Sequence, residues 1–154
     1  MHNLEPILRD HPFFKGLEPR FLEVIVGCAR NVVFKDDELI FREGEKANNF
    51  YIIRQGTVAL ELFIPGREPV LVATLGKGEV FGWSWLLAPY RWHFDAHARE
   101  QTRAIAFDAA CLRTKSETDH DFGYELFKRF SSIVADRLQA TRLQMLDIYG
   151  TVPE

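Results

Sequence analysis

Cysteine is scarce in this sequence, and long apolar runs are absent. The 154 residues include two cysteines, Cys28 and Cys111, which lie far apart and outside any Cys-x-x-Cys or Cys/His pattern. This spacing excludes the usual zinc motifs and a dense disulfide framework, and it predicts two reduced, buried thiols that pack as small hydrophobic side chains. No segment approaches the ~18 apolar residues of a membrane span, and residues 1–6 lack the basic start of a signal peptide. We therefore expect a cytoplasmic protein with no membrane contact.

A surplus of positive charge is also lacking, because 19 Lys and Arg residues face 22 Asp and Glu residues and the formal net charge is -3. A chain without an overall basic field does not attract nucleic acid through its net charge. No helix-turn-helix pattern follows the last expected helix, so we expect no DNA partner. The sequence has no Gly-x-Ser-x-Gly elbow, Walker loop or His-Glu-x-x-His motif, and we expect a protein that is not an enzyme.

The composition that is present, 47% hydrophobic with 13% aromatic and 27% charged residues, is that of a globular protein. At this length we expect residues 1–154 to form a single domain with three zones. Residues 1–30 carry apolar side chains at helical spacing and predict short helices. Residues 31–107 form short β-like runs separated by turns, such as Gln55-Gly56, where glycine supplies a positive φ. These runs predict an antiparallel double sheet or roll.

The third zone, residues 108–150, is predicted to be helical. Asp108 suits the N-cap of a short helix over residues 109–113, and a longer helix is expected over about residues 119–148. Its apolar residues step by three, four or seven positions: Phe122, Leu126, Phe130, Ile133, Val134, Leu138, Met145 and Ile148. A second apolar line contains Phe127, Leu143 and Leu146. Either all of this surface packs internally, or one line faces a partner; the double stripe leads us to predict a homodimer. Gly150 and Pro153 are expected to follow the end of the helix.

A known family has the same order of elements and similar motifs. The segment Phe41–Val58 contains a Glu-Gly-Glu turn, a Tyr-Ile-Ile strand and a glycine turn, and in this combination it resembles the cyclic nucleotide-binding domain of the catabolite activator family, protein kinase regulatory subunits and gated channels. Similar residues recur at 11–17, 78–82 and 136–138, so the resemblance extends over about residues 10–145. It implies a mainly β fold with flanking helices: an eight-stranded double-stranded β-helix, or jelly roll, with a long C-terminal helix.

In that family the ligand phosphate faces the backbone amides at the start of a short helix, and the resemblance places this cassette at residues 82–87. Gly82 would permit close approach of the backbone, and Ser84 would offer a hydroxyl. The family has a glutamate directly after the glycine and an arginine nine positions further; here those positions are Trp83 and Trp92. The lost phosphate contact is worth ~1.5–3 kcal/mol, so we predict that cyclic AMP does not bind tightly.

Three interpretations of the altered cassette remain. Trp83 and Trp92 fill the old pocket as core, or they stack on a different flat ligand whose acidic group meets Arg91. Alternatively, a one-residue bulge returns Arg91 to the phosphate. The candidate ligand-binding residues are Gly82, Trp83, Ser84, Arg91, Trp92 and His93.

A metal-binding alternative rests on His93, Asp95 and His97. These residues alternate with apolar ones, so on a strand over residues 92–98 they share one face, as metal ligands of a cupin-like enzyme would. Their spacing differs from the His-x-His motif of cupins, and a solvated strand face is the preferred interpretation. We therefore predict no metal and no cofactor.

The function we expect is that of a non-enzymatic sensor or adaptor. A cyclic nucleotide or another small anion in the cassette would shift the long helix and so change a dimer or partner-protein interface. The alternatives are a degenerate scaffold that binds no ligand and the cupin-like metal-dependent enzyme.

Overall fold

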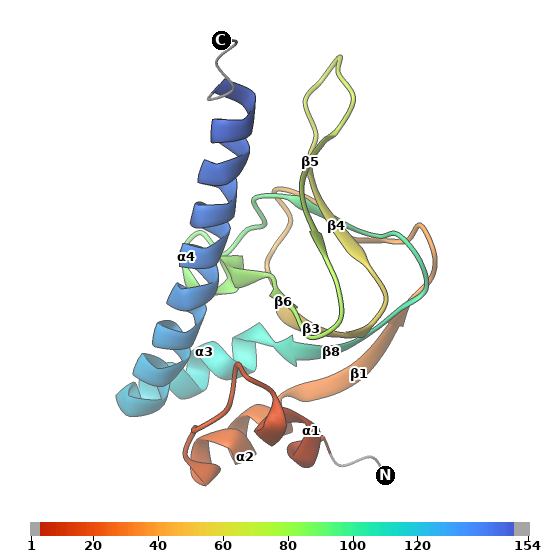
Figure 1. Ribbon diagram of the computed structural model, residues 1–154. Coiled ribbons are helices and arrows are strands. Elements are labelled where there is room, and N and C mark those ends of the chain that lie inside the picture. The colour runs from red at the N-terminus through yellow and green to blue at the C-terminus, as the bar shows by residue number, and fades with distance from the viewer. Residues whose placement is uncertain (1–3, 150–154) are drawn as a thin grey trace.

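The computed structural model describes residues 4–149, and the side chains of residues 4–146. Helices α1 (Glu5–Asp10) and α2 (Pro19–Gly27) precede eight strands, and α3 (Ala109–Thr118) and α4 (His120–Tyr149) follow them (Figure 1). The predicted mainly β fold class with a long C-terminal helix is confirmed. Gly150, Pro153 and the side chain of Ile148, which entered the predictions for the helix end and the apolar stripe, lie outside the described residues.

The strands form two four-stranded antiparallel sheets that face each other. The first sheet contains, in spatial order, β1 (Ala29–Phe34), β8 (Thr102–Asp108), β3 (Asn49–Gln55) and β6 (Val80–Phe81). The second contains β2 (Leu39–Phe41), β7 (Asp95–Ala98), β4 (Val58–Leu62) and β5 (Val70–Leu75). Within the described part of the chain, no helix has the length and apolarity that crossing a membrane requires.

The tight turn between β3 and β4 requires a glycine. Gly56 has a φ of 113°, and a Cβ placed there would lie 2.5 Å from Oγ1 of Thr102 and 2.7 Å from its Cα. Both the left-handed backbone and this close approach exclude a side chain. The Gln55-Gly56 turn predicted from the sequence is therefore present for a physical reason that includes a residue on β8.

The strand predicted to begin near residue 92 begins at Asp95 instead. The backbone of Trp92 is paired elsewhere: its amide donates to the carbonyl of Glu45 at 3.0 Å, and its carbonyl accepts from the amide of Gly44 at 2.9 Å. Arg91 and Lys46 form an isolated bridge beside this pair. The turn at residues 44–46 thus takes the hydrogen bonds that a longer β7 would have used.

The prediction of two reduced cysteines was wrong, because Cys28 and Cys111 form a disulfide with Cα atoms 6.2 Å apart. Cys28 is the C-cap of α2 and Cys111 lies in the first turn of α3. Pairing of β1 with β8 sets Ala29 opposite Phe107, which brings the adjacent helix ends together. Sequence spacing gave no indication of this contact, since 83 positions separate the two residues and only the sheet register makes them neighbours.

Both C-terminal helices begin at an aspartate cap. Asp108 accepts a hydrogen bond from the amide of Cys111 at 3.1 Å, as predicted for this N-cap. Asp119 accepts from the amide of Phe122 at 3.2 Å and from the guanidinium of Arg20 at 2.9 Å. The Phe122 hydrogen bond, with a smaller effect from Arg20, lowers the pKa of the Asp119 carboxyl. The cap residues therefore fix where α3 and α4 start.

The two halves of α4 differ in burial. Phe122, Leu126 and Phe130 are buried among the strands and the other helices, whereas Leu138 and Met145 are 63% and 53% exposed. In Figure 1 the second half of the helix stands beside the projecting hairpin of β4 and β5. One polar contact joins the two there, from Nε2 of Gln144 to the carbonyl of Val72 at 3.2 Å. Part of the apolar surface predicted on the helix is thus internal, and part is exposed.

Reduction of the disulfide should lower the free energy of unfolding by about 2–5 kcal/mol, because the crosslink spans 83 positions and restricts the unfolded chain. Urea unfolding with and without a phosphine reductant measures the difference. Cys28→Ser/Cys111→Ser is the control, since its transition should not respond to the reductant. Two titratable thiols per chain in the unfolded, non-reduced protein would contradict the crosslink.

Candidate functional site

The segment that the resemblance assigns to the cassette follows β6 and forms the short 3₁₀ helix η1 (Trp83–Leu86). Gly82 precedes it with a φ of 96°. A Cβ on Gly82 would lie 3.0 Å from Cη2 and 3.1 Å from Cζ3 of Trp92. The space that glycine leaves at this position is therefore occupied by the indole ring of Trp92.

Trp92 lies inside the roll. It is 6% exposed, and its ring stacks on Phe41 of β2 with centroids 3.7 Å apart and planes 8° from parallel. Stacking at this distance maximises contact between two large apolar surfaces. Trp92 thus connects the cassette glycine to the second sheet as a core residue.

Trp83, Ser84 and His93 form a small group at the start of η1. Trp83 is half-buried and stacks on the imidazole of His93, with ring centroids 5.4 Å apart. Ser84 is buried, and its hydroxyl is 3.0 Å from Nδ1 of His93. The Ser84 hydroxyl, predicted to face a ligand, is thus hydrogen-bonded to a neighbouring side chain.

Arg91 lies outside this group. Its side chain is exposed, and Nη1 donates to the carbonyl of Gly44 at 2.8 Å. It is not among the residues that line the cavity beside η1. The structure therefore brings Gly82, Trp83, Ser84, Trp92 and His93 together and places Arg91 at the turn over residues 44–46.

The cavity beside η1 is small. Its volume is about 20 Å³, and residues from β2, β4, β5, β6, η1 and α4 line it together with Trp92 and Phe94. This space suits a single water molecule, whereas small-molecule pockets measure roughly 300–1,000 Å³. The cavity beside η1 is therefore too small to hold a nucleotide in this conformation.

The only cation among the described residues of the cavity lining is a residue that was not among the sequence candidates. Arg137 on α4 lines the cavity, together with Ile133 one turn earlier on the helix. It is half-buried and is the one Arg or Lys among the lining residues. Helical periodicity placed Arg137 on α4, but the sequence held no signal that this part of the helix faces the cassette.

The three residues of the metal-binding alternative have separate partners. Nε2 of His97 is 2.9 Å from Oδ1 of Asp37 and Nδ1 is 3.4 Å from Glu61, while Asp95 accepts a hydrogen bond from the amide of Glu43. His93 contacts Ser84 instead. Among the described residues, no three His, Cys, Asp or Glu side chains are arranged to hold a metal ion. The cupin-like alternative has no geometric support there.

Burial changes the pKa of one ionisable side chain in the interior of the roll, that of Tyr51. Tyr51 is buried next to Phe41 and Phe81, and this burial raises the pKa of its hydroxyl above the usual value. The neighbouring amide of Asn49 partly offsets the effect by hydrogen bonding. Tyr51 is therefore a neutral member of the core at physiological pH.

A two-sheet roll with flanking helices and a long C-terminal helix is the fold that this chain shares with solved cyclic nucleotide-binding proteins. The family model described as "Cyclic nucleotide-binding domain" matches residues 31–119. The chain belongs to the cyclic nucleotide-binding domain family, as the motifs at residues 41–58 and 78–82 predicted.

Relatives with curated descriptions include a CRP-like cAMP-activated global transcriptional regulator of Mycobacterium tuberculosis, 24% identical over 148 residues. That match covers 96% of this chain and 64% of the regulator, so the chain spans a little less than two thirds of its length. The human cGMP-dependent protein kinase 2 is 31% identical over 112 residues, which are 72% of this chain and 14% of the kinase.

Solved structures give the same family. A putative cyclic nucleotide-binding protein from Geobacter metallireducens matches with a TM-score of 0.79 and 29% identity, covering 90% of this chain and 99% of that one. A cyclic nucleotide-binding domain from Methylobacillus flagellatus has a TM-score of 0.78 at 15% identity, over 99% of this chain and 84% of that one, which supports the fold alone.

Trp92→Ala should lower the free energy of unfolding by about 3–5 kcal/mol, because it removes a buried indole stacked on Phe41 and leaves a cavity. Trp83→Ala, at a half-buried position, is the matched control and should cost clearly less. Urea unfolding followed by far-UV circular dichroism gives both values. An equal or larger loss for Trp83→Ala would contradict the assignment of Trp92 to the core.

Proposed function

We propose that this chain is a non-enzymatic regulatory domain in which two tryptophans replace the family's ligand, and in which the exposed half of α4 is the output surface. The observation that carries the proposal is the cavity of about 20 Å³ beside Gly82. The regulatory role is proposed from the relatives of this chain, which include a cAMP-activated regulator and a putative cyclic nucleotide-binding protein. The function that fits both observations is an adaptor that acts through protein contact, without cyclic AMP in this cavity.

The proposed output surface is a stripe on α4. Phe127, Val134, Leu138 and Met145 follow one another at intervals of seven, four and seven residues, and each is between 37% and 63% exposed. This is the spacing of core positions in a two-stranded coiled coil. A second copy of the chain that presents the same stripe would cover these side chains.

The base of α4 is held so that this stripe keeps a defined direction. Nη1 of Arg129 donates to the carbonyl of Phe13 at 2.7 Å and to that of Lys15 at 3.2 Å. Nη2 of the same guanidinium is 3.6 Å from a carboxylate oxygen of Glu125. With its first half buried and tied to the loop after α1, the helix can present its second half as a rigid lever.

A second candidate function is a sensor for a small anion that displaces Trp92. Arg137 favours it, because a cation lining the cavity would meet the acidic group of such a ligand. Displacement would break the stack of Trp92 on Phe41, so this ligand would need to replace that contact.

Two further expectations belong to the proposal. We expect no enzymatic activity, because the family model that matches residues 31–119 describes a binding domain. The cytoplasmic location stays a prediction, and the Cys28–Cys111 disulfide weighs against it because the cytoplasm keeps most thiols reduced.

Cyclic AMP and cyclic GMP should give no saturable heat in calorimetric titrations up to about 1 mM, because the cassette lacks space and both polar anchors. A dissociation constant in the micromolar range for either nucleotide would contradict the proposal of an adaptor that acts without a cyclic nucleotide. Arg137→Gln would then distinguish the second candidate: a loss of about tenfold in affinity supports a site that uses this cation. Arg99→Gln, an exposed arginine outside the cavity lining, is the control.

The chain should have the mass of a dimer in light scattering at micromolar concentration, because exposed apolar positions on α4 pack against a second copy. Leu138→Glu/Met145→Glu should be monomeric with an unchanged circular dichroism spectrum. Gln139→Glu, on another exposed face of the helix, should remain dimeric. A monomeric mass for the unmodified chain across the concentration range would exclude this interface.

A further inference from the structure

A second pocket lies on the outer face of the first sheet, beside α1. Its volume is about 670 Å³, within the usual range for small-molecule sites. Residues of α1, β1, β3, β8 and the loop before β6 line it, and none of them lines the cavity beside η1. It is therefore a separate site in the same chain.

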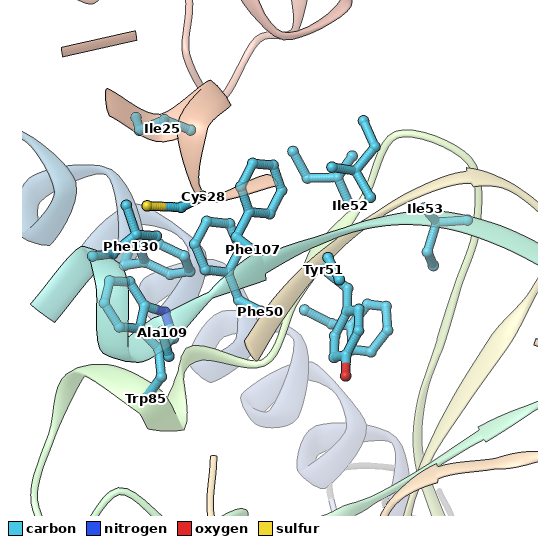
Figure 2. Packing of buried hydrophobic residues seen from close by; sticks show 14 of the residues in the cluster. Ile25, Cys28, Phe50, Tyr51, Ile52, Ile53, Trp85, Phe107, Ala109 and Phe130 are labelled. Carbon is cyan, nitrogen blue, oxygen red and sulfur yellow. The ribbon is translucent and has the colours of Figure 1, made fainter. Parts of the chain in front are cut away.

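Sheet register explains why this pocket has apolar walls. Ile105 of β8 pairs with Ile52 of β3, and alternation along a strand sends these side chains to the side opposite Tyr51. Figure 2 shows Tyr51 and Ile52 on opposite sides of β3. Ile105 and Ile52 form a buried floor, while Ile7 of α1 and Val33 of β1, 38% and 49% exposed, present apolar surface to a ligand.

Three cations surround these walls. Arg54, Lys77 and Arg103 line the pocket with exposed side chains, and no Asp or Glu lines it. Among the described side chains, none of the three makes a salt bridge. In a chain with a net charge of -3, this is a local concentration of uncompensated positive charge.

His11 lines the same pocket, but both of its ring nitrogens already form hydrogen bonds within the protein. Its Nδ1 accepts a hydrogen bond from the amide of Phe13 at 3.0 Å, which places the ring proton on Nε2. Nε2 in turn donates to the carbonyl of Gly78 at 2.7 Å. The imidazole thus joins the end of α1 to the loop before β6, leaving the arginines and the lysine to bind an anion.

We propose that this pocket binds an amphipathic organic anion of the fatty carboxylate class. The aliphatic chain would lie between Ile7 and Val33, where each methylene removed from water contributes about 0.8 kcal/mol. The carboxylate would meet Arg103, whose planar guanidinium matches its two oxygens, with Arg54 and Lys77 adding charge. The ligand needs both an aliphatic chain and a carboxylate, because the apolar walls bind the chain and the three cations bind the negative charge.

The probe is decanoate, and decanol is the neutral comparison of similar chain length. Calorimetry should show saturable binding of decanoate to the full chain, with decanol at least about tenfold weaker because it lacks the charge-assisted contact. Absence of saturable decanoate binding up to about 1 mM, or equal affinities for the two molecules, would overturn the proposal.

Variants at exposed positions locate the site without disturbing the core. Arg103→Gln should weaken decanoate binding about tenfold or more, and Val33→Glu should abolish it by placing an acid in the wall. Arg99→Gln, an exposed arginine that lines neither pocket, should bind as the unmodified chain does. Equal affinities for Arg103→Gln and Arg99→Gln would place decanoate elsewhere and exclude this pocket.

Light scattering with decanoate present distinguishes a small-molecule site from a contact between copies. The mass should not change on binding, because the pocket and the α4 stripe are different surfaces. Leu138→Glu/Met145→Glu should keep the decanoate affinity of the unmodified chain. Dissociation of a dimer by decanoate would show that a second copy occupies the pocket, and would overturn the proposal.

Discussion

The packing of Phe50 against the rings of Phe13, Trp85, Phe107 and Phe130 is the constraint on which the rest of this structure depends. Phe50 on β3 stacks on Phe107 of β8 with centroids 4.3 Å apart, and Trp85 of η1 and Phe130 of α4 lie 5.4 and 4.7 Å from it. Figure 2 shows these side chains gathered beside Ala109 at the start of α3. Since one ring contacts a strand, the cassette and the long helix, none of these elements can move without repacking the others.

The cassette is consequently fixed by aromatic packing on both sides of the first sheet. Trp85 is fully buried on the helical side of the first sheet, and Trp92 is buried inside the roll against Phe41 and Gly82. The space beside Gly82 is filled by the chain's own side chains. Aromatic packing supplies the apolar contacts at this position, and closely interdigitated side chains leave little space between them.

The two ends of the molecule are left with different surfaces. The second half of α4 presents exposed apolar side chains on a helix whose base is fixed by Arg129, whereas the outer face of the first sheet presents a basic, partly apolar pocket beside α1. The α4 stripe suits a flat protein surface and the pocket suits a small anion, because the first is convex and apolar and the second is hollow and charged. The pocket and the α4 stripe have no residue in common.

The sequence by itself determined what depends on local pattern. Glycine turns, alternating strands, the Asp108 cap and the apolar periodicity of α4 are properties of neighbouring residues, and motifs near residues 41–58 carried the family. Tertiary structure alone decided which distant residues meet. The Cys28–Cys111 disulfide, the indole of Trp92 against Gly82 and the facing of Arg137 toward the cassette each depend on sheet register or helix rotation. These are long-range geometric quantities, and periodicity along the chain does not encode them.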